Sequence, residues 1–165
     1  SDVYWRRMRI ASLSPAATEI LFALGLEKDI VCVDQFSNFP EEAKKIPRVK
    51  GHQEIKAEDV KQHAPEIVLT GTVIQQKLAE EFRANDLAVI HQDPRTINEI
   101  YESIRQLGVI FQRAKQAEDL VLKMQQGFNA MKKKSALLPR GQNARSGLWK
   151  NIFHKPERPF GARVF

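Results

Sequence analysis

The chain has 165 residues, of which 42% are hydrophobic and 28% charged, so it is long enough for one globular domain with a buried core. This composition excludes wholesale disorder and collagen-like repeats, and no apolar run approaches the roughly 18 residues of a membrane-spanning helix. A single cysteine, Cys32, excludes an internal disulfide framework and a cysteine-based zinc site.

The net charge of +6 comes from the two ends of the sequence. Residues 135–165 carry six basic side chains and one acidic side chain, whereas residues 9–134 carry equal numbers of both. A nucleic-acid-binding fold is expected to have a basic face, so this distribution argues against a nucleic-acid partner. Residues 1–8 contain no apolar signal-peptide segment. Either the chain is a mature form without its leader, or translation begins near Met8 and the protein is cytoplasmic.

The first part of the chain predicts strands that alternate with helices. A β-like run covers residues 8–13, and Ser14 is the expected N-cap of a helix that has Pro15 at its first position and ends at Gly25. The elements expected next, in chain order, are a strand over 30–33, a loop over 35–40, a helical turn over 41–45, a connection over 47–51 and a helix over 56–63.

The same alternation continues for two more strands and then gives way to helix. The expected elements are a strand over 67–69, a loop at Gly71-Thr72, a helix over 74–85, a strand over 87–90 and a turn over 91–95. After Thr96, apolar residues recur at intervals of three and four as far as the lysine run 132–134, which predicts long helix. We therefore predict an α/β fold with a parallel sheet of four to five strands flanked by helices, a Rossmann-like lobe.

Residues 139–165 break this pattern. They are rich in Pro, Gly, Arg and Asn, have scattered aromatic residues and show no hydrophobic period. This composition is typical of an extension that is either disordered or docked through its aromatic side chains.

No nucleotide-binding or hydrolase motif is present. The sequence lacks GxxxxGK[ST], GxGxxG and GxSxG, and Ser14, the candidate nucleophile nearest a strand end, has no base beside it. Ligands of parallel sheets bind at the loops beyond the carboxyl ends of the strands. Those loops here are Ser14-Pro15, 35–38, Gly71-Thr72 and Asp93-Pro94.

Two kinds of site are compatible with these loops. A metal site could draw on His52, His91 and Asp93, although all three also suit ordinary loop positions. Alternatively, Phe36 and Phe39, with His52 in the next loop, could stack on a large flat ligand. For Phe39 we expect packing onto the core instead, and for Phe36 both interpretations remain open.

The ordered motifs carry a family resemblance. The segments are RIASLSPAATEILFALG over 9–25, VDQFSNFP over 33–40, AEDV with APEIVL over 57–69, and DPRT with IYESIRQLG over 93–108. In this order they resemble the substrate-binding proteins of cobalamin and ferric-siderophore ABC importers, over residues 9–134. The resemblance implies two α/β lobes that are joined by one long backbone helix and clamp the ligand between them.

The resemblance also implies roles for individual residues. It places ligand contacts at the strand-end loops, at six positions: Ser14, Pro15, Phe36, His52, Gly71 and Thr72. Phe36 matches an aromatic residue that packs on the corrin, and His52 matches a position often occupied by a large aromatic. Glu58 matches a surface acid that docks onto arginines of the membrane permease, although an acid in the first turn of a helix is also favoured by the helix dipole.

The chain departs from that family's pattern after the long helix. We expect an N-terminal extension over 1–8, a ligand-binding lobe with the start of the connecting helix over 9–134, and an atypical basic tail over 135–165 in place of a second lobe. A lone lobe offers half a cleft, so two copies could pair through it to form a homodimer.

The resemblance implies a periplasmic or membrane-associated extracellular protein that captures a solute and delivers it to a permease. The expected ligand is cobalamin, haem or an iron chelate, with no covalent cofactor, no resident metal and no catalytic residue. The alternatives are a metal-dependent, chelatase-like enzyme built on His52, His91 and Asp93, or a small α/β interaction domain.

Overall fold

The computed structural model describes residues 6–135. It divides after Gln116 into two compact units, and the described parts are residues 6–116 and residues 117–135. Among the described residues, the first unit contains every strand and every residue expected at the ligand site. The second contains most of one long helix, α5 (Ala114–Ser135), and each unit is described by itself.

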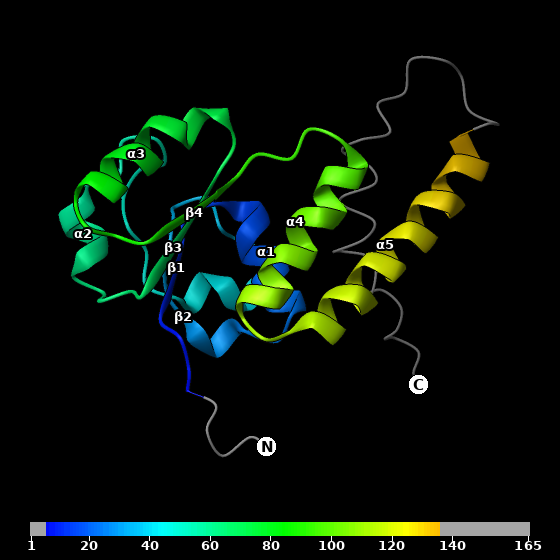
Figure 1. The fold of residues 1–165 in the computed structure, drawn as a ribbon, viewed down its shortest axis with the longest axis horizontal. Helices are drawn as coiled ribbons and strands as arrows, with labels where there is room; N and C mark the ends of the chain where they lie inside the picture. The colour runs from blue at the N-terminus through cyan, green and yellow to red at the C-terminus, as the bar shows by residue number, and fades with distance from the viewer. Residues whose placement is uncertain (1–5, 136–165) are drawn as a thin grey trace. The chain divides into compact units, whose positions relative to one another are not determined.

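A four-stranded parallel sheet forms the centre of the first unit (Figure 1). Its strands are β1 (Ile10–Ser12), β2 (Ile30–Val33), β3 (Ile67–Gly71) and β4 (Val89–Gln92), in the spatial order β2-β1-β3-β4. The first helix follows β1, and the chain then moves outward to β2 before it crosses back to β3 on the other side of β1. This arrangement confirms the predicted fold class, with four strands among the described residues.

Helices cover both faces of this sheet (Figure 1). On one face lie α1 (Pro15–Ala23) and α4 (Ile97–Ile110), and on the other lie α2 (Ala57–Lys61) and α3 (Gln76–Ala84). Three 3-10 turns complete the unit: η2 (Glu27–Asp29), η3 (Glu41–Lys45) and η4 (Val73–Gln75). Because helices cover both faces, the strands begin with apolar residues that face both sides, and their polar residues stand toward the carboxyl ends, at Ser12, Thr70, His91 and Gln92.

One continuous core cluster lies between the sheet and its helices. It consists of buried side chains from strands, loops and helices: Ala11, Leu13, Cys32, Val49, Ile55, Val60, Val68, Leu78 and Phe82. Burial raises the pKa of the Cys32 thiol to about 12, so this cysteine stays protonated and serves as a small core residue. Helices α1 and α4 carry buried residues of their own, including Leu21 and Leu107.

Helix ends follow one recurring motif. After α1, Gly25 has a φ of 77°, its N–H donates to Phe22 O, and the N–H of Leu26 donates to Leu21 O, which together form a Schellman motif. The same positive φ occurs without glycine at Ala64, Asp86 and Gln112. Of these four helix ends, only the one at Gly25 was predictable from a glycine in the sequence.

The structure corrects several predicted boundaries. Helical periodicity after Thr96 gave no sign of the break between α4 and α5, where Gln112 has a φ of 56° and Arg113 N–H donates to Gly108 O. Gly71 belongs to β3 and not to a loop, because it pairs in register with Gln92 of β4. The fourth strand correspondingly lies two residues later than predicted.

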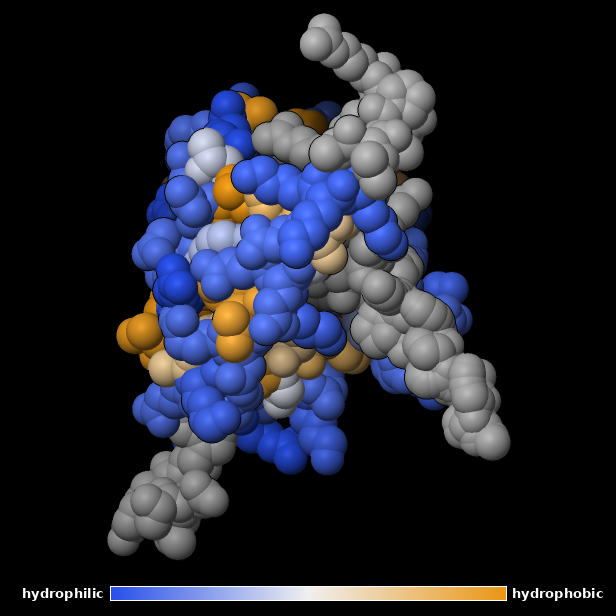
Figure 2. Space-filling view, turned by 90° about the vertical axis from the view of Figure 1, so that its right-hand side faces the viewer, coloured by the Kyte–Doolittle hydropathy of each residue, from blue (hydrophilic) through white to orange (hydrophobic). Residues whose placement is uncertain are grey.

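The surface shows few large apolar groups. On the face drawn in Figure 2, hydrophilic residues predominate and the hydrophobic ones lie among them in small groups. The exposed large hydrophobic residues of the described chain are Phe36, Val73, Ile74, Val109, Ile110 and Leu122. Within residues 6–135, no helix is both long and apolar enough to cross a membrane.

Candidate ligand-binding site

The candidate site lies at the carboxyl edge of the sheet. Because all four strands are parallel, the residues that follow them meet at this one edge. Ser14 follows β1, Phe36 follows β2 and Thr72 follows β3. His52 reaches the same edge because residues 47–49 run beside β2, where Val33 N–H donates to Pro47 O and Val49 N–H donates to Val33 O.

Ser14 and Gly71 lie against each other. Ser14 is the N-cap of α1, and its Oγ accepts from Ala17 N–H at 3.5 Å, while the half-buried Pro15 occupies the first helical position, as predicted. A Cβ on Gly71 would lie 3.0 Å from Ser14 Oγ, so only glycine lets the two strand ends approach this closely.

Phe36 and His52 form an aromatic pair. Their ring centroids are 5.6 Å apart and their planes are inclined at 72°, an edge-to-face arrangement. Phe36 is 52% exposed, which rules out the interpretation that it packs into the core. Phe39, for which core packing was expected, is half-buried. The pair therefore presents an apolar surface at the same edge as Ser14 and Gly71.

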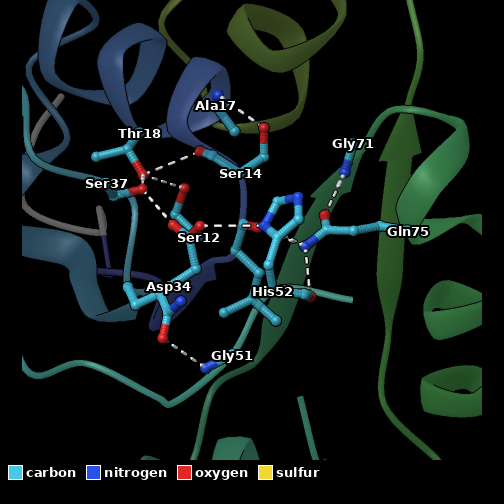
Figure 3. Close-up of polar contacts among 12 residues, drawn as sticks. Ser12, Ser14, Ala17, Thr18, Asp34, Ser37, Gly51, His52, Gly71 and Gln75 are labelled. Carbon is cyan, nitrogen blue, oxygen red and sulfur yellow. Dashed lines mark hydrogen bonds and ion pairs between the residues drawn. The ribbon is translucent and has the colours of Figure 1, made fainter. Parts of the chain in front are cut away.

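A buried carboxylate lies behind His52. Asp34 is fully buried, and its Oδ2 lies 3.3 Å from His52 Nδ1 while its Oδ1 accepts from the Ser37 hydroxyl. Ser37 Oγ is 2.8 Å from Thr18 Oγ1, which is 2.8 Å from Ser12 Oγ. These hydroxyls join the end of β1, helix α1 and the loop after β2 into one network (Figure 3).

Gln75 joins the remaining segments to this network. Its side chain is fully buried, its Oε1 accepts from Gly71 N–H at 2.9 Å, and its Nε2 donates to Leu13 O at 2.8 Å and to His52 O at 2.9 Å. One amide group thus connects the ends of β1 and β3 with the loop that carries His52 (Figure 3).

Arg48 holds the loop that carries Phe36. Its guanidinium donates to Asp34 O at 2.8 Å, to Ser37 O at 2.7 Å and to Ala43 O at 3.2 Å. Gln35 adds one more link, because its Oε1 accepts from Gly51 N–H at 3.1 Å. Main-chain carbonyls that the loop itself cannot pair are satisfied in this way, and the loop conformation becomes defined.

The segment after β3 contributes further exposed apolar groups. Thr72 is exposed, has a φ of 65°, and its N–H donates to Gln92 O at 3.2 Å. Val73 and Ile74 come next and are 58% and 55% exposed. With Phe36, they are the large exposed hydrophobic residues that follow strand ends. The structure therefore pairs Ser14 with Gly71 and Phe36 with His52, and Gln75 joins the two pairs. Pro15 and Thr72 are the chain neighbours of Ser14 and Gly71.

The hypothetical metal site is not assembled. His91 lies in β4, where its Nδ1 is 2.8 Å from Thr70 Oγ1, and burial lowers its pKa. Asp93 pairs instead with Arg95, whose Nη2 is 2.7 Å from its Oδ2. Across the described part of the chain, no group of three or more His, Cys, Asp or Glu side chains is placed to hold a metal ion. His52 is engaged with Asp34 and Gln75, apart from the other two.

Glu58 lies away from this edge. It is exposed in the first turn of α2, in a shallow depression whose lining includes Glu54, Lys56, Glu81 and Asn85. Glu81 and Asn85 belong to the C-terminal end of α3, whereas the strand-end loop that contains Thr72 precedes its N-terminal end. The surface of Glu58 is therefore separate from the candidate ligand site.

The residues that organise the site were not among those predicted from the sequence. Asp34 directly follows a predicted strand, which is a usable signal for a functional carboxylate. Gln75 and Arg48 gave no comparable signal, because a glutamine in a helical pattern and an arginine in a loop are ordinary surface residues until the fold buries their ends.

Comparison with known proteins defines the family. The family model described as periplasmic binding protein matches residues 10–143. The vitamin B12-binding protein of Pectobacterium carotovorum subsp. carotovorum (strain PC1) is 30% identical over 139 residues, which is 84% of this chain and 49% of the relative. The chain belongs to the periplasmic binding protein family, and the relatives that it matches are binding proteins and not enzymes.

Solved structures agree with this assignment. The periplasmic vitamin B12 binding protein BtuF of Vibrio cholerae superposes with a TM-score of 0.69 at 25% identity, over 78% of this chain and 51% of that one. The periplasmic heme binding protein HutB of Vibrio cholerae gives a TM-score of 0.68 at 26% identity, over 84% and 53%. The chain spans about half the length of the curated relatives it matches.

Proposed function

We propose that this chain forms a ligand-binding lobe of the solute-capturing component of an ABC importer. Its ligand is a compound of the cobalamin, haem or ferric-siderophore class, bound without chemical change. Residues 9–134 supply the lobe and the start of its connecting helix. The names of the relatives support this class, since they bind vitamin B12 or heme.

The aromatic pair Phe36–His52 carries the proposal. A side chain as large as Phe36 that remains 52% exposed at the carboxyl edge of a parallel sheet offers apolar area where ligands of such sheets bind. The exposed Val73 and Ile74 extend that area from the neighbouring strand end. Ser14, Pro15, Gly71 and Thr72 supply hydroxyl and main-chain groups around it, which suits a large flat ligand with a polar rim.

The direct test is a titration of the purified chain with cyanocobalamin, hemin and a ferric siderophore, each followed by the quenching of tryptophan fluorescence. We expect saturable binding of at least one of them. Phe36→Ala should lower that affinity about tenfold or more, corresponding to about 1.4 kcal/mol, with little change in the melting temperature. Val109→Ala is the matched control, because Val109 is 71% exposed on α4 and is not one of the strand-end residues.

Two outcomes contradict the proposal. If none of the three ligands binds, the ligand class is wrong. If one binds and Phe36→Ala leaves its affinity unchanged, the site lies elsewhere on the molecule.

Delivery to a permease is the second half of this function. We place its contact at Glu58, whose side chain is exposed and lies apart from the candidate ligand edge. Location in the periplasm, or at the outer side of a membrane, follows from the same role. Glu58→Lys should abolish importer-dependent uptake without changing ligand affinity, and unchanged uptake would remove Glu58 from the docking surface.

Pairing of two copies through the exposed ligand edge remains a prediction from the sequence. Sedimentation velocity at increasing protein concentration tests it, with Phe36→Ser as the variant that disrupts the apolar edge. A strictly monomeric chain at every concentration would exclude this form of association.

A further inference from the structure

The hydrogen bonds of Gln75 determine its orientation completely. Gly71 N–H can only donate, so the atom that faces it is Oε1. The opposite atom faces the carbonyl oxygens of Leu13 and His52, at 2.8 Å and 2.9 Å, so it is the amide nitrogen. An amide nitrogen has two hydrogens, and these two carbonyls take both of them.

These hydrogen bonds require a hydrogen on His52 Nδ1. The Gln75 Nε2 lies 3.3 Å from His52 Nδ1, but it has no hydrogen left to donate there. Asp34 Oδ2 lies at the same distance from Nδ1, and a carboxylate oxygen accepts hydrogen bonds. A bare Nδ1 would therefore place its lone pair against that oxygen with no proton between them.

The hydroxyl network confirms that Asp34 is the acceptor. Ser37 donates its hydrogen to Asp34 Oδ1, while the Thr18 hydroxyl donates to Ser14 O at 3.1 Å and lies 2.8 Å from Ser37 Oγ. The Asp34 carboxylate therefore accepts at Oδ1, and its other oxygen, Oδ2, faces His52 Nδ1.

We propose that Asp34 and Gln75 are positioning residues that hold the neutral His52 ring in its Nδ1–H tautomer, with the lone pair on Nε2 available to the ligand. Gln75 withholds an amide hydrogen from Nδ1, and Asp34 accepts the hydrogen that Nδ1 then carries. Figure 3 shows the other ring nitrogen pointing away from both residues. Among the described residues Nε2 has no hydrogen-bond partner. The role toward a ligand rests on the proposed function.

The tautomer matters because the two ring nitrogens do opposite things. An unprotonated Nε2 can accept a hydrogen bond or coordinate a metal centre, whereas Nε2–H can do neither. A carboxylate that accepts from Nδ1–H also fixes the orientation of the ring. His52 would then be a polar, directional contact beside the apolar surface of Phe36.

Nitrogen-15 NMR of the ligand-free chain tests the tautomer without reference to any ligand. Long-range correlations from the ring carbon protons distinguish Nδ1–H from Nε2–H in the neutral imidazole, and the spectrum of His52→Gln identifies the His52 signals. We expect Nδ1–H. An Nε2–H pattern, or an equal mixture of both tautomers, would overturn the proposal.

Variants separate positioning from simple structural support. Asn in place of Asp34 can turn its NH2 toward the ring, so Asp34→Asn should reverse the tautomer to Nε2–H and lower the affinity for hemin about tenfold or more. Asp93→Asn is the matched control and should change neither, because Asp93 pairs with Arg95. A folded Asp34→Asn chain that keeps Nδ1–H would overturn the role of Asp34.

Gln75 has its own variant. Gln75→Leu should allow the His52 loop to move, so that its ring signals show both tautomers, whereas the exposed Gln76→Leu should leave one. A single Nδ1–H tautomer in folded Gln75→Leu would remove Gln75 from the proposal. If wild type shows Nδ1–H but binds none of the three ligands, the tautomer stands and the proposed function fails.

Discussion

The missing side chain of Gly71 allows the ends of β1 and β3 to meet: a Cβ there would lie 3.0 Å from Ser14 Oγ and 3.2 Å from Gln92 O. The first atom belongs to a helix N-cap and the second to the neighbouring strand. Ser14 Oγ accepts from Ala17 N–H and Gln92 O accepts from Thr72 N–H, so neither atom can move away without breaking a hydrogen bond. This contact therefore links the start of α1 to the distance between the ends of β1 and β3.

Gly71→Ala should therefore destabilise the fold by about 1–3 kcal/mol through overpacking, measured by urea unfolding. The same variant should weaken ligand binding, because Ser14 must shift. Gly25→Ala is the comparison: Gly25 has a φ of 77° but no atom within 4 Å of its Cβ position, so strain lowers stability while the ligand edge stays intact. Equal stability of Gly71→Ala and wild type would show that the strand ends are not tightly packed.

Arg48→Lys should destabilise the chain by about 1–3 kcal/mol despite the conserved charge. A lysine ammonium cannot reach Asp34 O, Ser37 O and Ala43 O with the planar fork that the guanidinium uses, so buried carbonyls lose their donors. Chemical denaturation measures the loss. Arg105→Lys, at an exposed pair with Glu102, should change stability by no more than about 0.5 kcal/mol. Similar effects of the two substitutions would contradict the assigned role of Arg48.

Asp29→Asn should change the pH dependence of stability. Burial raises the pKa of Asp29, and within residues 6–135 its Oδ2 has no hydrogen-bond partner. A carboxyl whose pKa is higher in the folded than in the unfolded state binds more protons when folded, so stability falls as the pH rises through its titration. The variant should therefore be more stable than wild type at neutral pH and lose this advantage at a pH below the ordinary titration of aspartate.

Thermal unfolding of Asp29→Asn and wild type across that pH range measures the difference. Glu58→Gln serves as control, because Glu58 is exposed and its substitution should leave the curves parallel. An advantage of Asp29→Asn that stays constant with pH would show that the charge of Asp29 is not its cause.

Ala64→Gly and Ala84→Gly should have opposite effects. Ala64 ends α2 with a φ of 50°, where the Cβ of alanine is strained, so glycine should stabilise the fold by about 0.5–1 kcal/mol. Ala84 is exposed in the last turn of α3, where glycine should cost up to about 1 kcal/mol. Melting temperatures of the two variants relative to wild type provide the test. A loss of stability in both would mean that Ala64 is not strained.

Local signals in the sequence were enough for the class of fold. Short apolar runs between amphipathic segments predicted the parallel sheet, Ser14-Pro15 predicted the start of α1, and Gly25 predicted its end. These features depend on neighbours within a few residues, so they can be identified in the chain itself. The strand-end loops were also foreseeable, because parallel strands always bring their carboxyl ends to one edge.

The tertiary structure decided which residues organise that edge. Gln75 lies 62 residues from Leu13 and 23 from His52, and its role appears only when the fold brings both carbonyls to its amide. The break at Gln112 was equally hidden, since glutamine marks no helix end by itself. Sequence therefore determined the sheet, the first helix and the edge of the sheet at which the candidate site lies. Long-range hydrogen bonding alone decided that His52 joins Asp34 and Gln75 in its polar centre, and not His91 and Asp93.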